Sequence, residues 1–198
     1  MNKRGIIARA LWALLLVGVM SGLLMVGVTA IFTDQATNPA NAFTAGTLDL
    51  AISPVTAMFT VNQMAPGDVV YSGLQVTNGG NLAQRYAVTT TPDNGSILDE
   101  QLDLTMDVVT GAGVDGIWYT ADDVVGAANV YGPDGVLSAA AIGNPAQGAQ
   151  AGDRTLAAGS NERLRYKVTL PLGTGNGYQG TTATVAFVFD AEQTANNP

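Results

Sequence analysis

The sequence predicts an all-β protein, a jelly-roll-like antiparallel β-sandwich, from three observations. After residue 45, short stretches in which apolar and polar residues alternate recur along the chain, as half-buried strands require. Clusters of Gly, Pro and Asn separate these stretches, and the 198-residue chain contains 24 Gly and 8 Pro. No long stretch with the period of an amphipathic helix competes with the strands. Several short strands divided by turn residues are typical of sandwiches and jelly rolls.

The first thirty residues predict an export signal rather than part of the sandwich. Three basic residues precede an uncharged run over 10–28, and Val28-Thr29-Ala30 provides the small residues that a signal peptidase recognises. The sequence therefore predicts a signal peptide over 1–30, cleaved after Ala30. Because 19 uncharged residues are long enough to span a bilayer, an uncleaved membrane anchor is the alternative. Contact with a membrane is expected only through the uncleaved signal.

An extended N-terminal arm, residues 31–45, follows the predicted cleavage site. Ile31 and Phe32 are apolar at its tip and Phe43 is apolar at its base, but the stretch TDQATNPAN between them is too polar to pack on its own. Such a segment suits a donor strand that pairs with an exposed sheet edge of another chain. The alternative is an arm that pairs within its own domain or stays disordered. Gly46 is the predicted hinge, because it can turn where a Cβ would be strained.

The sandwich domain is expected over residues 46–198. The expected strands are 46–53, 57–63, 69–78, 82–91, 102–110, 162–170 and 182–189. Alternation places a set of large apolar side chains on the inner faces of these strands. They include Tyr86, Val88, Leu104, Met106, Leu164, Tyr166, Phe187 and Phe189. Between residues 110 and 159 the pattern loosens, which predicts a loop-rich excursion with one or two short strands and a weakly indicated helix over 135–142.

The composition excludes several classes of function. The chain has no His and no Cys, so it can form no Ser-His-Asp triad, no HExxH zinc helix and no disulfide. The adjacent acidic pairs Asp99-Glu100 and Asp122-Asp123 are interpreted as exposed loop acids rather than a glycosidase pair. All 16 acidic residues and five of the eight basic ones lie beyond residue 30, which gives the mature chain a net charge of −11. Such a surface disfavours nucleic acid and anionic lipid as partners.

One segment predicts a metal site. The stretch DGIWYTADD gathers the carboxylates of Asp115, Asp122 and Asp123 around a Gly turn within nine residues. Oxygen-rich loops suit Ca²⁺, which takes six to eight oxygen ligands. The stretch is similar to the DG-x-x-x-T-x-DD calcium loops of some secreted proteins, although it occurs once here. A solvated acidic loop without a metal is the alternative, and no other cofactor is expected.

Four stretches of the chain resemble the TasA/camelysin (CalY) family of secreted proteins. They are IFTDQATNPANAFTAGTLDL directly after the signal, MAPGDVVYSGLQVTNGGNLAQRYAV, LAAGSNERLRYKVTLP and the closing GYQGTTATVAFVFDAEQT. The resemblance weakens between Thr110 and Gly159. It implies a jelly-roll domain that polymerises into extracellular fibres of a biofilm matrix, in which the N-terminal arm of one subunit completes the sheet of the next. Camelysin also carries a metallopeptidase label, which a chain without His does not support.

The expected function is therefore that of a secreted structural subunit, not an enzyme. Its main partner would be a second copy of itself in a head-to-tail polymer, alongside other components of an extracellular matrix or cell surface. Two alternatives stay open. One is a camelysin-type secreted metallopeptidase, and the other is a monomeric surface adhesin that uses residues 110–159 as its contact loop.

Overall fold

The computed structural model describes residues 11–13, 45–55, 59, 64–93 and 97–197. The chain divides into two compact units, Met1–Thr44 and Ala45–Pro198. The predicted cleavage site at Ala30 and the arm residues Ile31, Phe32 and Phe43 lie outside the described residues. Within the described part of the chain, no helix has the length and hydrophobicity needed to span a membrane.

The second unit is the predicted antiparallel β-sandwich. Its strands are β1 (Leu50–Ser53), β2 (Val69–Asn78), β3 (Gln84–Pro92), β4 (Asp103–Gly111), β5 (Val124–Val136), β6 (Ala141–Ile142), β7 (Arg154–Leu156), β8 (Asn161–Thr169) and β9 (Val185–Gln193). Two short 3-10 turns complete it, η1 (Leu137–Ala139) and η2 (Asn176–Tyr178). The fold-class prediction is confirmed. The expected strand over 57–63 falls almost entirely outside the described residues.

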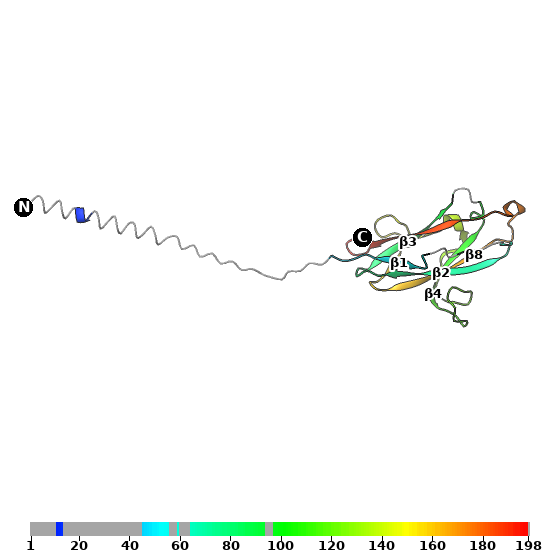
Figure 1. The fold of residues 1–198 in the computed structure, drawn as a ribbon, viewed down its shortest axis with the longest axis horizontal. Coiled ribbons are helices and arrows are strands. Elements are labelled where there is room, and N and C mark those ends of the chain that lie inside the picture. Colours follow the sequence, from blue (N-terminus) through cyan, green and yellow to red (C-terminus); the bar gives the residue numbers. More distant parts are fainter. Residues whose placement is uncertain (1–10, 14–44, 56–58, 60–63, 94–96, 198) are drawn as a thin grey trace, which may run out of the picture. The chain divides into compact units, whose positions relative to one another are not determined.

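The strands form two sheets. One sheet has the order β1-β2-β8-β4-β5, and all of its pairs are antiparallel. In the second sheet, β9 pairs with β3 along its whole length, so β6 and β7 share the opposite edge of β3. Figure 1 shows β1, β2, β4 and β8 in one layer and β3 in the other. The chain crosses between the layers at β2–β3, β3–β4, β5–β6, β7–β8 and β8–β9, and repeated crossing of this kind is typical of jelly rolls.

The core lies between the layers and is made by alternating side chains, as predicted. Tyr166 and Leu164 of β8 and Tyr86 and Val88 of β3 are almost fully buried. The Tyr166 ring meets the Phe187 ring edge-on, with centroids 4.9 Å apart. Close packing of this kind accounts for most of the favourable free energy of folding.

The region 110–159 differs from its prediction, because it contains the 13-residue strand β5 as well as β6 and β7. The period-two signal is lost in β5 because its register shifts repeatedly against β4. Asn129 and Asp134 have positive φ there, and Pro133 has no N–H to donate. At the predicted helix over 135–142 the structure has the end of β5, the turn η1 and the short strand β6.

Candidate functional site

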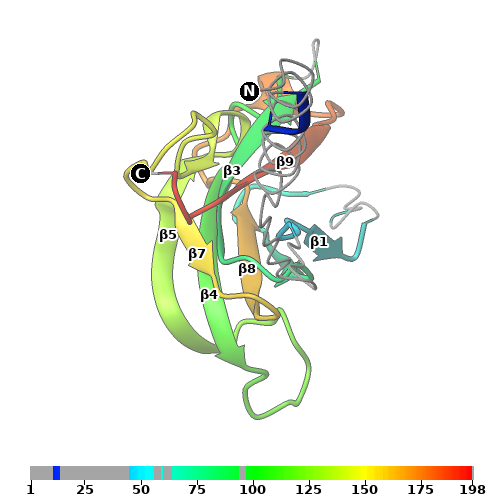
Figure 2. The ribbon, with the colours of Figure 1, turned by 90° about the vertical axis from the view of Figure 1, so that its left-hand side faces the viewer.

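A groove of about 1460 Å³ opens between the two sheets, on the side bounded by β1 and β9. Its walls include Leu74 and Val168 of the first sheet and Phe187 and Phe189 of β9. Residues of the β8–β9 connection and Pro54, just after β1, also line it. Figure 2 shows β1 and β9 on the same side of the domain, with β5 on the opposite side. The groove is therefore an opening into the core, bounded by the outermost strand of each sheet.

The inward-facing residues of β9 are incompletely covered at this groove by the part of the chain that the structure describes. Val185, Phe187 and Phe189 pack against the core but are only half-buried, whereas Tyr86 and Val88 of the neighbouring β3 are buried. Apolar side chains left half-exposed in a row mark a site that another segment can cover. The groove therefore has the properties of a binding site for an extended apolar or amphipathic segment.

Two strand edges face the groove. No strand in the described part of the chain pairs with the outer edge of β9, although its nine residues pair regularly with β3 on the other side. In the first sheet, β1 pairs only with Gln75–Asn78, so the stretch Val69–Leu74 of β2 has no described strand on its groove side. Strand edges of this kind offer backbone N–H and C=O groups to an incoming strand.

The sandwich has two distinct ends. We call the end that carries Asn78, Gln84 and Asn161 the near end, and the end that carries Val69 and Val185 the far end. None of the groove-lining residues comes from the near-end turn over 78–83, whereas the β8–β9 connection at the far end contributes many.

Hydrogen bonds tie the near end together. The Asn81 N–H donates to the Thr47 carbonyl at 3.2 Å, and the Thr47 N–H donates to Asn81 Oδ1 at 2.7 Å. On the other side of the same turn, the Thr194 N–H donates to the Ala83 carbonyl at 3.1 Å. The segments that lead into β1 and out of β9 are thus both fastened to the turn between β2 and β3.

Gly46 lies at this near end, where the second unit begins. A Cβ on Gly46 would stand 2.5 Å from the Leu82 side chain. The φ angle of Gly46 is not in the positive range that favours glycine. The structure therefore gives close packing, and not an unusual backbone angle, as the reason for glycine at this position. Its role as a hinge stays a prediction.

The loop between β4 and β5, residues 112–123, carries the three aspartates of the predicted calcium site, and each binds N–H groups of the loop itself. Asp122 Oδ2 accepts from the Val114 N–H at 2.9 Å, Asp123 Oδ2 from the Tyr119 N–H at 2.8 Å, and Asp115 Oδ1 from the Ile117 N–H at 2.8 Å. The pKa of Asp122 is lowered, mainly because its carboxylate accepts a hydrogen bond from the Thr120 hydroxyl.

Among the described residues, no group of three or more acidic side chains is placed to hold a metal ion. The calcium site at Asp115, Asp122 and Asp123 stays a prediction. A titration of Tm with Ca²⁺ tests it, and an unchanged Tm at millimolar calcium rejects it.

Two arginines of β8 fasten this loop to the outer face of the first sheet. Arg165 pairs with Asp107 of β4 at 2.8 Å and donates to the Thr120 carbonyl at 2.8 Å. The Arg163 guanidinium lies 4.2 Å from the Trp118 ring centroid. Arg165 faces outward from the sheet, as the alternation predicts, yet it is buried because the loop covers it. The loop thus covers part of the outer face of the first sheet, and its use as a contact loop stays a prediction.

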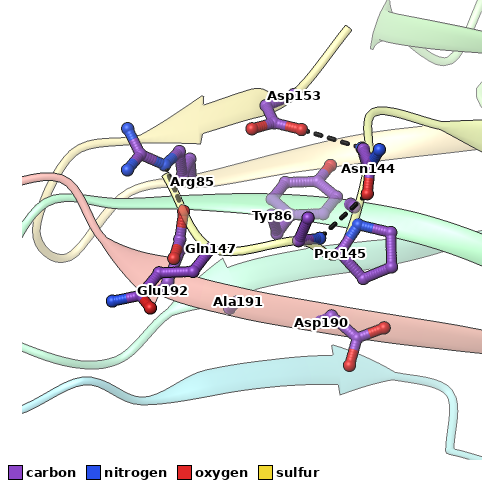
Figure 3. Close-up of a pocket in the computed structure, with 11 residues that line it drawn as sticks. Arg85, Tyr86, Asn144, Pro145, Gln147, Asp153, Asp190, Ala191 and Glu192 are labelled. Carbon is purple, nitrogen blue, oxygen red and sulfur yellow. Dashed lines mark hydrogen bonds and ion pairs between the residues drawn. The ribbon is translucent and has the colours of Figure 1, made fainter. Parts of the chain in front are cut away.

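A smaller pocket of about 210 Å³ lies on the outer face of the second sheet (Figure 3). Arg85 of β3 pairs with Glu192 of β9 at 2.5 Å. The hydrogen bond from Arg85 is the main reason why the pKa of Glu192 is lowered. The carboxylate of Asp153 accepts the N–H groups of Asn144 at 2.9 Å and Gln150 at 2.8 Å. These polar groups form ion pairs and hydrogen bonds with one another, and they hold residues 143–153 against the sheet.

Comparison with protein families decides the identity of the chain. The family model described as camelysin metallo-endopeptidase matches residues 6–111, more than half of the chain. The chain belongs to the camelysin family. No curated protein matches it. The match runs to Gly111 at the end of β4, so the two later stretches that resemble the family lie outside it.

Membership of the camelysin family supports a role as a secreted matrix protein or a camelysin-type protein. The residues of this camelysin-family chain offer little for metal-dependent proteolysis, because histidine and cysteine are both missing from the sequence. Carboxylates are the remaining metal ligands, and in the described part of the chain they form no metal-binding cluster.

The groove is the part of the site that the sequence does not reveal. Alternation in β9 identifies Phe187 and Phe189 as inward-facing, but alternation alone does not tell whether a further strand covers them. The one available signal is the shortness of β1, which ends at Ser53 before Pro54. This four-residue edge strand pairs only with Gln75–Asn78 of β2.

Proposed function

We propose that this protein is a secreted structural subunit that polymerises into extracellular fibres, in which the arm Ile31–Phe43 of one copy fills the groove of the next. The observation that carries the proposal is the groove between β1 and β9, where the described residues leave Val185, Phe187 and Phe189 half-buried. The camelysin-family match supports the same assignment.

The length of the arm fits the groove. Thirteen extended residues reach about 43 Å, whereas the nine residues of β9 span about 30 Å. The arm can therefore cover β9 and still cross to its own domain. Pairing with a sheet edge satisfies the backbone of a polar segment that cannot pack alone, and each apolar side chain that becomes buried contributes about 1.5–3 kcal/mol. These gains offset the loss of freedom on association.

Head-to-tail growth follows from where the second unit begins. Ala45 and Gly46 precede the near end, which is fastened to the turn 81–83, whereas the groove is lined from the far half of the sandwich. An arm that leaves one end and a groove reached from the other make a heterologous contact, which builds an open filament when its rotation does not close a ring.

Export can control when assembly begins. While the signal peptide remains attached, Ile31 continues into the apolar run and its tip is tethered. Cleavage after Ala30 frees the tip, so that polymerisation starts outside the cell. Filaments then belong to an extracellular matrix or cell surface, with other matrix components as additional partners.

Electron microscopy and sedimentation of two purified forms test the proposal. The mature chain starting at Ile31 should form filaments, and a form starting at Ala45 should remain monomeric with the same circular dichroism spectrum. A monomeric mature chain would favour the adhesin alternative. Filaments from the form that starts at Ala45 would contradict the role of the arm.

A peptide experiment isolates the groove. A synthetic peptide of residues 31–43 should raise the Tm of the form starting at Ala45, because a ligand that binds only the folded state stabilises it. A peptide with the same composition in scrambled order is the matched control. An equal effect of the two peptides would show that the groove does not recognise the arm.

The metallo-endopeptidase activity in the family description is the second candidate. Cleavage of unfolded casein by the purified chain, lost on addition of a chelator, would establish it. The lack of histidine and cysteine in the chain leads us to expect no chelator-sensitive cleavage.

A further inference from the structure

We infer that Asn176, in the connection between β8 and β9, is a site of spontaneous deamidation, which converts this residue of the groove wall into an acid. The modification takes place on the folded chain and needs only water. Its chemistry is independent of the proposed function, and only its effect on assembly rests on that function.

Three Asn-Gly pairs occur in the sequence, and this dipeptide is the one in which deamidation is fastest. The backbone nitrogen of the glycine attacks the Cγ of the asparagine, a C–N bond forms, and the side-chain nitrogen leaves as ammonia. Water then opens the resulting five-membered succinimide at either carbonyl, which gives aspartate or isoaspartate. Glycine favours the attack because it has no Cβ to hinder its nitrogen. The structure describes Asn78-Gly79 and Asn176-Gly177, whereas Asn94-Gly95 lies outside the described residues.

The fold blocks the reaction at the first pair. Asn78 is fully buried, and its Nδ2 donates to the Leu82 carbonyl at 2.8 Å and to the Ala157 carbonyl at 3.1 Å. The Gly79 N–H, whose nitrogen would attack, donates to the Asp49 carbonyl at 2.9 Å. Because both the leaving group and the attacking nitrogen are held, Asn78 can react only when the near end opens.

The second pair lacks these restraints. Asn176 and Gly177 are exposed, and among the described residues no hydrogen bond holds the Asn176 amide or the Gly177 N–H. A Cβ at Gly177 would meet nothing within 4 Å, so the succinimide ring has room to form.

The backbone around Asn176 is also easy to open. The pair lies in η2, a single 3-10 turn in which the Asn176 carbonyl accepts the Gln179 N–H at 3.2 Å. In Figure 1 this turn is drawn in orange at the far end of the domain. One short exposed turn opens at little cost in free energy, which lets the Asn176 backbone rotate until its Cγ meets the Gly177 nitrogen.

Deamidation at this position changes the groove. Asn176 lines the groove together with Gly175 and Tyr178. The reaction adds a negative charge there, and isoaspartate also inserts the Cβ atom into the backbone of the β8–β9 connection. The part of the chain beyond residue 30 already carries a net charge of −11. A deamidated copy should therefore receive a further copy more slowly, because like charges repel.

Peptide mapping of the folded mature chain by mass spectrometry tests the modification. Samples are incubated at mildly alkaline and at mildly acidic pH, and Asn176 should convert to aspartate and isoaspartate faster at the higher pH, where the attacking nitrogen loses its proton more readily. Asn78 in the same sample should convert at least about tenfold more slowly, because it waits for local opening. In urea, where the fold is lost, the two residues should convert at similar rates.

Gly177→Ala is the matched variant. The added Cβ meets open space, and Gly177 is not among the residues with positive φ, so the fold should be kept with the same circular dichroism spectrum. The Cβ hinders the attacking nitrogen, and conversion of Asn176 should slow markedly. The inference would be overturned by an Asn176 that converts in urea but stays intact in the folded chain, by equal rates at Asn78 and Asn176 in the folded chain, or by an unchanged rate in Gly177→Ala.

The effect on assembly has its own test. Asn176→Asp reproduces the aspartate product, and Asn176→Ser is the uncharged control. Filaments of Asn176→Asp should grow a few-fold more slowly at low salt, and the difference should narrow as salt screens the added charge. Equal growth of the two variants would overturn the effect on assembly. If the mature chain forms no filaments at all, the proposed function fails, whereas the mass spectra still decide whether Asn176 is modified.

Discussion

At the scale of single residues, one hydrogen-bonded network joins the two sheets. Glu162 of β8 accepts the Tyr86 hydroxyl at 2.5 Å and binds Arg154 of β7 at 2.6 and 2.8 Å. Burial is the main cause that raises the pKa of Tyr86 well above its usual range, and the Glu162 charge raises it further, so the hydroxyl stays neutral and donates. The network closes the near end of the core, beside the turn that fastens β1 and β9.

Replacing Glu162 should therefore weaken the contact between the sheets. We expect Glu162→Gln to lower the free energy of unfolding by about 2 kcal/mol, because Arg154 loses its charge partner while still partly buried. Urea unfolding of the form starting at Ala45 measures the change. Glu100→Gln, at an exposed position, is the matched control and should change stability by less than about 0.5 kcal/mol. Equal effects of the two substitutions would show that the network contributes nothing specific.

Asp103 gives a prediction that depends on pH. Burial, followed by repulsion from Asp134, raises the pKa of Asp103 above its usual value, while Lys167 acts in the opposite direction. The stability contributed by protonated Asp103 is present below the unfolded-state pKa, and it is lost as the pH rises through the folded-state pKa. Asp103→Asn should therefore raise Tm at pH 7, and the gain should vanish as the pH falls toward about 4. Asp93→Asn, at an exposed position, should show no such trend, and a gain that persists at low pH would refute the electrostatic cause.

At the scale of elements, the loop 112–123 depends on a glycine in the strand beneath it. A Cβ on Gly73 would stand 2.2 Å from the Tyr119 ring and 2.4 Å from the Leu164 carbonyl oxygen. Gly73→Ala should therefore lift the loop and lower the free energy of unfolding by roughly 1–3 kcal/mol, with a change in Trp118 fluorescence. Gly173→Ala is the control, because nothing lies within 4 Å of its Cβ position. An unaltered Trp118 signal in Gly73→Ala would show that the loop does not rest on this strand.

Elements with strict alternation could be predicted from the sequence, whereas those formed by distant contacts could not. The bounds of β2 agree with the predicted 69–78, and β8 differs from its prediction by one residue at each end. The strand β5 could not be predicted from the sequence because its bulges depend on contacts with β4. In one of these contacts, Asp107 Oδ1 accepts a hydrogen bond from the Asn129 N–H at 2.8 Å. The groove could not be predicted for a similar reason, because the sequence pattern around Phe187 is the same whether its side chain is half-buried or fully buried.

At the scale of the whole molecule, charge sets the conditions for assembly. The part of the chain beyond residue 30 carries a net charge of −11, and Arg85, Arg154 and Arg165 are each paired with an acid of their own copy. Copies that meet end to end therefore repel one another. The repulsion between exposed charges is screened over about 10 Å at 0.1 M salt and over about 30 Å at 0.01 M. The barrier to association should thus depend on ionic strength, whereas the apolar contacts in the groove should not.

We expect filament growth of the mature chain to accelerate as NaCl rises from about 0.01 to about 0.2 M, because screening lowers the repulsion between like-charged copies. Light scattering after removal of the signal peptide measures the rate. A double variant, Asp93→Asn with Glu100→Gln, removes two exposed charges near the far end and should grow faster at low salt with a weaker salt dependence. If salt acted only by strengthening apolar contacts, the variant and the unaltered chain would show the same dependence. Growth that slows with added salt would mean that attraction between opposite charges, and not apolar docking of the arm, drives the subunits together.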